Sequence, residues 1–344
     1  MNASTNVSAF QVQNNLFCKK NLAFARFLFI SYNYIFSISH TMNITFNCDE
    51  NYSPYLSVLI KNILDKRSSL YSINFYVLDL GISEESKNYI SELVNKNNSK
   101  IKFISVDQSD FDVFPQTIEY ISKSSYARLK IADYLQGVDK TIYLDIDIIV
   151  NDDLRSLWNT GLKNQSIAAC VDPFIEINNN NYKKLIGLSN SNLYFNAGII
   201  IFDLDKCRKE NMFQLCLKWI NQHKNFTYQD QDILNGVFEG KVMYLNSRFN
   251  FTVNHRSRIK ENQKSKITLK DYELCEFPIC IYHHTGPIKP WHSESQNNKS
   301  EHFYKTWNSL EHKPKHWYVE SVTFFKILKR KFKETKDKII YKIY

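Results

Sequence analysis

Glycine and proline are both scarce in this sequence, with 8 Gly and 7 Pro among 344 residues. That scarcity, together with 43% hydrophobic residues, excludes a fibrous or disordered chain and indicates one large α/β domain with at most a small appendage. The seven cysteines form no CxxC pair, and an odd, scattered set argues against a secreted fold held by disulfides. We therefore expect reduced, mostly buried thiols in a cytosolic protein.

Acidic residues are fewer than basic ones, 35 against 44, and the net charge of +9 favours an anionic partner. No zinc-ligand spacing or RNA-recognition motif accompanies this charge, so a nucleic acid is not the expected partner. At 322–342, VTFFKILKRKFKETKDKIIYK, there are eight Lys/Arg and two acidic residues, and apolar side chains recur at helical spacing. The pattern predicts that residues 313–344 form a basic amphipathic tail on the anionic inner face of the cytoplasmic membrane. The alternatives are a terminal helix packed on the domain and a frayed basic tail.

Residues 1–41 lack the features of a complete targeting segment. The stretch KKNLAFARFLFISYNYIFSIS has a basic start and an apolar run, but Arg26 and Asn33 interrupt it and no small-residue cleavage site follows. A weak membrane anchor is one interpretation. We favour the other, an N-terminal extension that precedes the true start at Met42, where a clear strand pattern begins.

The chain after Met42 alternates between strand and helix patterns. Short β-rich runs at 43–48, 72–80 and 100–106 are separated by helical patterns at 53–66 and 83–96. A helix is then expected at 124–135, in SSYARLKIADYL, and a strand at 140–147, in KTIYLDID. This order predicts a mostly parallel sheet with helices on both faces, in which ligands collect at the carboxyl ends of the strands.

Two carboxylates, Asp145 and Asp147, lie in one of the most apolar runs of the chain, TIYLDIDIIVND. Ionised groups in such a setting need a cation or a water-exposed edge, because an isolated buried charge costs many kcal/mol. Carboxylates at i and i+2 can converge on one Mg²⁺ or Mn²⁺ that also holds a diphosphate. Alone, the pair is weak evidence, since a solvated strand end or two helix caps would also explain it.

A second cluster of chemically versatile residues occurs late, in ICIYHHTGPIKPW at 279–291. His283 or His284 could complete a metal shell, Gly286 permits close backbone approach to an anion, and Lys289 could neutralise a phosphate. Each of these residues alone is more often structural. Their gathering after a strand is the unusual feature.

Six segments, in this order and spacing, resemble the successive motifs of the family 8 retaining glycosyltransferases: NITFNCDENYSPYL, YARLKIADYL, YLDIDIIVNDDL, NAGIIIFDLDKCR, YQDQDILN and IYHHTGPIKPW. The resemblance covers residues 42–312, which it implies form the catalytic domain. It implies the GT-A fold, a Rossmann-like nucleotide-binding half merged with an acceptor half, here followed by the basic helical tail.

The resemblance also implies a ligand set. The metal ligands would be Asp145, Asp147 and His283, holding Mn²⁺ or Mg²⁺ on the diphosphate of a UDP-sugar; His283 is preferred to His284 because Gly286 and Lys289 then fall at the family's third and sixth positions after it. The residues around the nucleotide sugar would be Asp49, Asn51, Tyr52, Arg128, Asp145, Ile146, Asp147, Asn196, Ala197, Gly198, Gly286 and Lys289.

The catalytic residues implied are Asp230 and Gln231, beside the reacting carbon of the donor sugar, and Lys289, which would stabilise the departing UDP. Asp172 resembles a further carboxylate of the sugar pocket. As an alternative, Asp230 and Asp232 could simply cap the following helix. We expect a same-face reaction, in which the leaving phosphate oxygen takes the acceptor proton, in preference to double displacement through Asp230 or Gln231.

The expected function is therefore transfer of a hexose from a UDP-sugar to a glycan, with the growing core of lipopolysaccharide or lipooligosaccharide as the preferred acceptor. Galactose is placed slightly ahead of glucose, although the two sugars differ at only one hydroxyl and the motifs alone do not choose between them. The alternatives are a glucosyltransferase acting on a protein-linked glycan or polysaccharide, a metal-dependent nucleotide phosphohydrolase, and a noncatalytic binding module.

Overall fold

The computed structural model describes residues 40–69, 71–117, 123–178, 180–252, 275–276, 278–295 and 299–341. The expected extension, residues 1–41, lies outside the described residues apart from His40 and Thr41. The chain divides into two compact units, one comprising Met1–Thr41 with Ser69–Ser72, the other Met42–Ser68 with Ile73–Tyr344. The fold described below is that of the second unit.

A seven-stranded mixed sheet, of order β3-β2-β1-β4-β7-β6-β8, forms the centre of this unit. The pairs β1–β4, β2–β3 and β6–β8 are parallel, whereas β7 runs antiparallel to both β4 and β6. The strands are β1 His40–Cys48, β2 Tyr71–Asp79, β3 Lys100–Ser105, β4 Lys140–Leu144, β6 Ile167–Val171, β7 Phe195–Asp203 and β8 Val242–Leu245. The predicted mostly parallel α/β sheet is confirmed, with β7 as the reversed strand.

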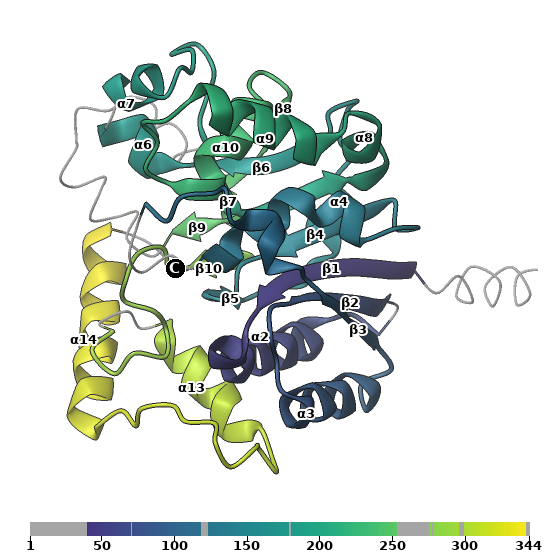
Figure 1. Cartoon of the computed structure of the whole chain (residues 1–344). Helices are drawn as coiled ribbons and strands as arrows, with labels where there is room; N and C mark the ends of the chain where they lie inside the picture. Colours follow the sequence, from purple (N-terminus) through teal and green to yellow (C-terminus); the bar gives the residue numbers. More distant parts are fainter. Residues whose placement is uncertain are drawn as a thin grey trace, which may run out of the picture. The chain divides into compact units, whose positions relative to one another are not determined.

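Helices accompany both halves of the sheet (Figure 1). The purple and blue α2 and α3 lie beside the β1–β3 half, and the green α8, α9 and α10 beside β6 and β7. The α-helices are α2 Ser53–Lys66, α3 Glu84–Asn95, α4 Ile131–Tyr134, α5 Arg155–Trp158, α6 Pro173–Asn178, α7 Asn180–Leu185, α8 Leu204–Lys209, α9 Met212–Gln222, α10 Gln229–Val237, α13 Ser300–Ser309 and α14 Phe324–Tyr341. The 3₁₀ helices are η1 Glu50–Tyr52, η2 Gln108–Phe111, η3 Lys123–Lys130 and η4 Ser247–Phe249.

Two predicted elements differ in detail from the structure. The helix expected at 124–135 is mostly the 3₁₀ helix η3, followed by the single α-turn α4. The strand expected at 140–147 stops at Leu144, and the chain resumes as β5 Ile148–Val150 in a separate three-stranded sheet. In that sheet β10 Ile281–His283 lies between β5 and β9 Phe251–Thr252. Asp145 and Asp147 therefore lie where the chain passes from one sheet to the other.

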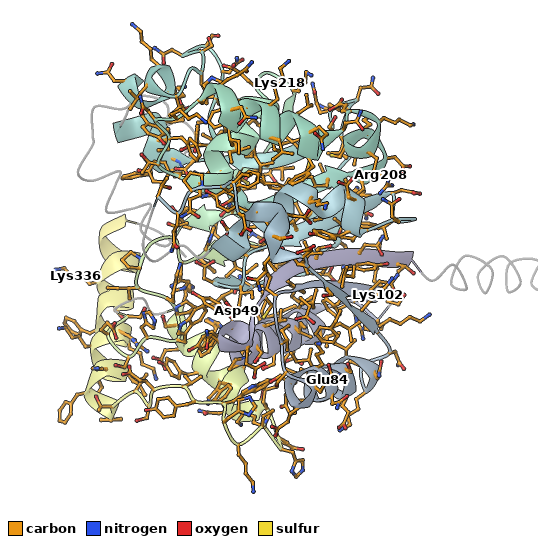
Figure 2. The ribbon with its side chains drawn as sticks, in the orientation of Figure 1. Asp49, Glu84, Lys102, Arg208, Lys218 and Lys336 are labelled. Atoms are coloured by element: carbon orange, nitrogen blue, oxygen red, sulfur yellow. The ribbon has the colours of Figure 1, made fainter. Side chains whose placement is uncertain are left out.

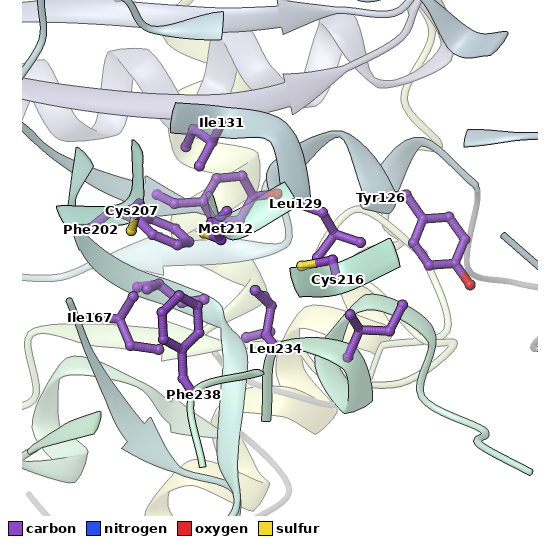
Figure 3. Packing of buried hydrophobic residues seen from close by; sticks show 14 of the residues in the cluster. Tyr126, Leu129, Ile131, Ile167, Phe202, Cys207, Met212, Cys216, Leu234 and Phe238 are labelled. Atoms are coloured by element: carbon purple, nitrogen blue, oxygen red, sulfur yellow. The ribbon is translucent and has the colours of Figure 1, made fainter. Parts of the chain in front are cut away.

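A large apolar core lies between the β4–β7–β6 part of the sheet and the helices α8 to α10. Figure 3 shows Ile167 and Phe202 from the strands close to Leu234 and Phe238 from the α10 region. Each such side chain contributes about 1.5–3 kcal/mol when it is removed from water. This packing fixes the start of β7 and of α10, two segments that bring polar residues to the candidate site.

The C-terminal helix α14 forms as predicted and lies beside α13 in Figure 1. Arg330 is 2% exposed, and its guanidinium donates to the carbonyl oxygens of Ser293 and Ser295 and pairs with Glu301 at 2.7 Å. The helix is therefore attached to the domain through a buried charged side chain, and most of its other described side chains, at 324–332, 335 and 336, face solvent. Among the described residues, no helix has the length and apolar content needed to cross a membrane.

The cysteines of the described residues are buried, as predicted for reduced thiols. They are Cys48, Cys170, Cys207, Cys216, Cys275 and Cys280. Burial raises the pKa of the Cys280 thiol to about 12, so this side chain is a neutral thiol rather than a reactive thiolate. Cys18 lies outside the described residues.

Candidate active site

A cavity of about 470 Å³ opens at the carboxyl ends of β1 and β4 and at the start of β7. It is lined by nearly all of the residues that the sequence singled out, namely Asp49, Tyr52, Arg128, Asp145, Ile146, Asp147, Asp172, Asn196, Ala197, Gly198, Asp230, Gln231, His283, Gly286 and Lys289. Asn51 does not line it: this residue is exposed on η1. Segments separated by up to 240 residues thus meet at one edge of the sheet.

Asp145, Asp147 and His283 come together inside the cavity. Each offers a ligand atom within 4.8 Å of the other two, and His283 Nε2 lies 3.1 Å from Asp147 Oδ1 and 3.9 Å from Asp145 Oδ2. Two sheets supply this geometry: Asp145 N–H donates to Gly198 O of β7, whereas Asp147 O accepts from His284 N–H just after β10.

The donor set fits a divalent cation. Asp147 Oδ1 is buried and has no hydrogen-bond partner among the described residues, and it faces a ring nitrogen of His283 whose other nitrogen is already bonded to Asn250. A cation shared by these two atoms would satisfy both of them. Space is reserved as well, since a Cβ on Gly198 would lie 2.3 Å from His283 Cε1 and 2.8 Å from Asp145 Oδ2. Two carboxylates and one imidazole are therefore a donor set that could hold a divalent cation.

The structure distinguishes the two adjacent histidines. His283 belongs to β10 and directs Nε2 toward the two carboxylates, whereas the His284 ring is buried with Nε2 unpartnered and is not part of the three-residue group. Burial lowers the pKa of His284 to about 3, which keeps its imidazole neutral. The histidine beside the two carboxylates is therefore His283, the one that the spacing argument preferred.

Lys289 brings a positive charge to the same carboxylate. Its Nζ lies 2.5 Å from Asp147 Oδ2, and burial would raise the pKa of Asp147 if the ammonium did not hold it well below its usual range. The turn that delivers Lys289 depends on Gly286, whose φ of +102° lies in a region that side-chain-bearing residues rarely adopt. Asp147 is thus ionised, with one oxygen on Lys289 and the other directed at His283.

The segment after β1 forms another wall of the cavity. Asp49, labelled in Figure 2, caps η1 by accepting from Tyr52 N–H at 3.1 Å. The Tyr52 ring meets Tyr55 and Trp291 edge to face, so it belongs to an aromatic cluster rather than standing alone. Asp49 and Tyr52 thus line the cavity, whereas Asn51 is exposed to solvent.

Arg128 joins the metal-capable group to the other carboxylate of the cavity. Its guanidinium contacts Asp145 Oδ1 at 2.9 Å and Asp230 Oδ2 at 3.0 Å, donates to Ala197 O, and lies over the Tyr143 ring at 4.3 Å. Burial alone would lower the pKa of Arg128, but the two carboxylates raise it above its usual value. The planar fork therefore fixes the positions of two acids that lie on different elements.

The two acidic residues of α10, Asp230 and Asp232, have different partners. Asp232 caps the helix, because its carboxylate accepts from the backbone N–H groups of Thr227 and Tyr228. Asp230 instead faces Arg128, and burial raises its pKa although the guanidinium opposes this. The capping alternative is thus observed for Asp232.

The Gln231 side chain is held at both ends. Its Oε1 accepts from Ala197 N–H at 3.0 Å and its Nε2 donates to Asp172 Oδ2 at 3.2 Å. Asn196 donates to the same carboxylate oxygen at 3.1 Å. One wall of the cavity is therefore a polar surface of fixed orientation, of the kind that recognises hydroxyl groups.

Sequence reasoning missed several lining residues. Thr252 is 2% exposed and lines the cavity in register with His283, and within the part of the chain that the structure describes its hydroxyl has no partner. Tyr143 donates to Asp145 from β4, and Asn47 lies two residues before Asp49. Tyr143 and Asn47 each lie two residues before a predicted site residue, Asp145 and Asp49. Because alternate residues of a strand face the same side, this spacing could have predicted both as lining residues. Thr252 belongs to a two-residue strand with no motif of its own.

Comparison with known proteins identifies relatives over most of the chain. Residues 43–295 match the model of the family described as glycosyl transferase family 8. A putative glycosyltransferase of Haemophilus influenzae is 41% identical over 305 residues, which is 87% of this chain and 89% of that protein. The lipopolysaccharide 1,2-glucosyltransferase of Escherichia coli K12 is 26% identical over 74% of each chain. A crystal structure of the galactosyltransferase LgtC, in complex with donor and acceptor sugar analogs, superposes with a TM-score of 0.75 at 38% identity, covering 80% of this chain and 99% of that one.

Proposed function

The chain belongs to glycosyl transferase family 8, and on this premise we propose that it transfers a hexose, galactose in preference to glucose, from a UDP-sugar to a glycan with retention of configuration. The GT-A type fold agrees with that membership. The observation that carries the proposal is the convergence of Asp145, Asp147 and His283 in the same cavity as Asp230 and Gln231. A metal-capable group and a hydroxyl-recognising wall in one cavity are what a nucleotide sugar requires.

The diphosphate is assigned to the metal-capable end. A divalent cation bound there supplies a Lewis acid for the diphosphate oxygens. The Lys289 ammonium, which contacts Asp147, is positioned to contact a phosphate as well. Its fixed positive charge would then stabilise the negative charge that develops on the departing UDP. Asp49 and Tyr52 are assigned to the uridine, and Gly286 to backbone approach beside the phosphates. Asn51, on the exposed face of η1, is assigned to the rim of the uridine site.

The sugar is assigned to the wall formed by Asn196, Gln231 and Asp230. We favour the same-face reaction, in which the leaving phosphate oxygen accepts the proton of the attacking hydroxyl. Two contacts support it over double displacement: Gln231 Oε1 already accepts from Ala197 N–H, and Asp230 is paired with Arg128, which lowers its nucleophilicity. Arg128 would hold Asp145 and Asp230 in place around the donor.

The acceptor is proposed to be a growing lipopolysaccharide or lipooligosaccharide core. The relative from Escherichia coli that is named a lipopolysaccharide 1,2-glucosyltransferase supports this class, and a protein-linked glycan or polysaccharide is the second candidate. A nucleotide phosphohydrolase fits less well, because the amide-lined wall at Asn196 and Gln231 would then have no ligand.

Incubation with Mn²⁺ and a panel of UDP-sugars tests the proposal. UDP release should occur for one hexose donor and should rise when truncated lipooligosaccharide is added. Release of UMP and hexose 1-phosphate in place of UDP would favour a phosphohydrolase, because such an enzyme cleaves the diphosphate rather than the bond to the sugar. No release from any donor, with UDP bound and Mn²⁺ present, would refute transfer.

The tail is proposed to bind an anionic membrane surface. Phe325, Leu328 and Phe332, spaced for one helical face, are 83%, 47% and 77% exposed, and lysines such as Lys336, labelled in Figure 2, flank them. Amphipathic helices bind membranes in this way: their apolar side chains enter the membrane–water interface, and their ammonium groups contact the anionic head groups. Because Arg330 attaches α14 to the segment at Ser293 and Ser295, this mode would hold the catalytic domain at the bilayer.

Removal of residues 322–344 is expected to abolish binding to vesicles of phosphatidylethanolamine with phosphatidylglycerol, measured by co-sedimentation. The double change Phe325→Ser and Phe332→Ser should weaken it by about 100-fold or more, since each buried ring contributes at least about 1.4 kcal/mol, or a factor of ten. Turnover on a soluble acceptor should persist, most clearly in the double variant, which keeps Arg330.

Leu185→Ser is the matched control, because Leu185 is also an exposed apolar residue, at 63%, but lies on α7. It should leave vesicle binding intact. Equal loss of binding and turnover in the double variant would instead indicate a structural helix.

A further inference from the structure

We propose that Asn250 is a positioning residue that couples the sugar pocket to the metal site by fixing which nitrogen of His283 carries the proton. It is one of four buried residues, Asp172, Asn196, Asn250 and His283, joined in a continuous hydrogen-bonded series, here called the amide relay. Asn250 is 4% exposed and does not line the cavity, so it acts through its neighbours. The inference rests on the metal site of the proposed function.

The relay begins at a group that only accepts. Asp172 Oδ1 accepts from the backbone N–H groups of Phe174 and Ile175, and Oδ2 accepts from Asn196 Nδ2 at 3.1 Å. An ionised carboxylate has no proton to donate, so the Asn196 group facing it must be the NH₂.

The orientation of Asn196 is therefore determined. Its Oδ1 points the other way, where it accepts from Gly198 N–H at 3.0 Å and from Asn250 Nδ2 at 2.9 Å. The reversed amide would place an oxygen against the Asp172 carboxylate and an NH₂ against the Gly198 N–H. Both contacts would be repulsive, and both groups are buried, so the reversed state is strongly disfavoured.

Asn250 passes this orientation to the histidine. With its NH₂ committed to Asn196, it presents Oδ1 to His283 Nδ1 at 2.8 Å. An oxygen at that position requires a proton on Nδ1. A neutral imidazole carries one N–H, so Nε2 is left with its lone pair directed at Asp145 and Asp147. The relay thus presents the tautomer that can bind a cation.

The same hydrogen bonds connect the metal site back to the residues assigned to the sugar. Asn196 and Asp172 line the cavity, and Asp172 also accepts from Gln231, so the residues assigned to the sugar share hydrogen bonds with the partner of a metal ligand. Partners that orient a metal-binding histidine typically change metal affinity by 10- to 100-fold when removed. Loss of Asn250 should accordingly weaken both sites although it touches neither ligand.

Two substitutions separate the two contacts of Asn250. N250L has a similar size and removes both hydrogen bonds. N250D keeps an oxygen for His283 Nδ1–H but presents a second oxygen to Asn196 Oδ1, which breaks the sugar side alone. N62L is the control, because Asn62 is a half-buried amide that bonds Val150 N–H of β5 and lies outside the relay.

The test measures Mn²⁺ binding to the full chain with UDP, from the electron paramagnetic resonance signal of free Mn²⁺, together with kcat and KM for the donor. N250L should bind Mn²⁺ about 10- to 100-fold more weakly. N250D should bind Mn²⁺ within about threefold of wild type, while its donor KM rises about tenfold, the effect of one hydrogen bond. N62L should change neither value.

The outcomes distinguish this inference from the function on which it rests. No Mn²⁺ binding by the wild-type chain would overturn the metal assignment itself. Mn²⁺ binding by wild type and N250L with equal affinity would overturn only the relay. If N250L fails to fold, as judged by circular dichroism, N250D decides: parallel losses of Mn²⁺ affinity and turnover would contradict the relay, and loss on the sugar side alone would support it.

Discussion

Replacement of Asp147 by asparagine is expected to remove Mn²⁺ binding and to lower turnover by at least about 10²-fold, the usual cost of losing one group that stabilises developing charge. Asp147 is the residue whose two oxygens are committed to different partners, Lys289 on one side and the His283 site on the other. An amide in its place can still accept from Lys289, but it removes the negative charge and one oxygen ligand. Asp147→Ala should have the same effect on turnover and should also leave the Lys289 ammonium without its partner.

The control for this experiment is Asp152→Asn. Asp152 lies five residues further along, pairs with Arg248 at 3.3 Å and has a side chain that is 43% exposed, outside the cavity. It should leave Mn²⁺ binding and turnover unchanged. Full turnover by either Asp147 variant, in the presence of a metal chelator or of Mn²⁺, would refute the metal-site assignment.

Substitution in the sugar wall should separate binding from chemistry. Asp230→Asn and Gln231→Ala are each expected to lower kcat by about 10²-fold, while the affinity for UDP stays within about threefold, because both residues lie in the wall that we assign to the sugar. Asp230→Asn removes the charge that Arg128 shares with Asp145, and Gln231→Ala leaves Ala197 N–H and Asp172 without their partner.

UDP binding can be followed by calorimetry and turnover by UDP release. Gln136→Ala, at an exposed glutamine that bonds only the backbone of its own turn, is the control and should change neither value. Unchanged turnover in both site variants would contradict a role for Asp230 and Gln231 in transfer, whereas UDP binding without turnover by the wild-type chain would favour a noncatalytic binding module. Equal loss of UDP affinity and kcat would mean that these residues position the nucleotide rather than the sugar.

Local patterns in the sequence predicted much of the fold and the composition of the site. The helix at 53–66 was predicted at its observed bounds, because a full amphipathic pattern with a proline in the first turn leaves little choice. The positions of Asp145 and Asp147 at the end of an expected strand indicated a cation site, and the family resemblance added His283 as their partner. The structure brings those three residues together.

Long-range pairing accounts for what the sequence did not predict. The strand at 140–147 looked continuous because its apolar residues run on past Asp145, and only β10, more than 130 residues later, draws Ile148–Val150 into another sheet. The partners of Asn250 and Thr252 are also distant in sequence. These two residues belong to a short segment whose neighbours are set by β10, so neither periodicity nor spacing could reveal their roles.

The passage of the chain between two sheets at Ile146 has a consequence for folding. One carboxylate of the metal-capable group is held by the seven-stranded sheet, through Gly198, and the other by the three-stranded sheet, through His284. An ion that binds both carboxylates can do so only when the two sheets are correctly docked, so its binding free energy adds to the stability of that docking. The bound ion would then act as a removable cross-link, and the two sheets would be held together most firmly while both carboxylates bind it.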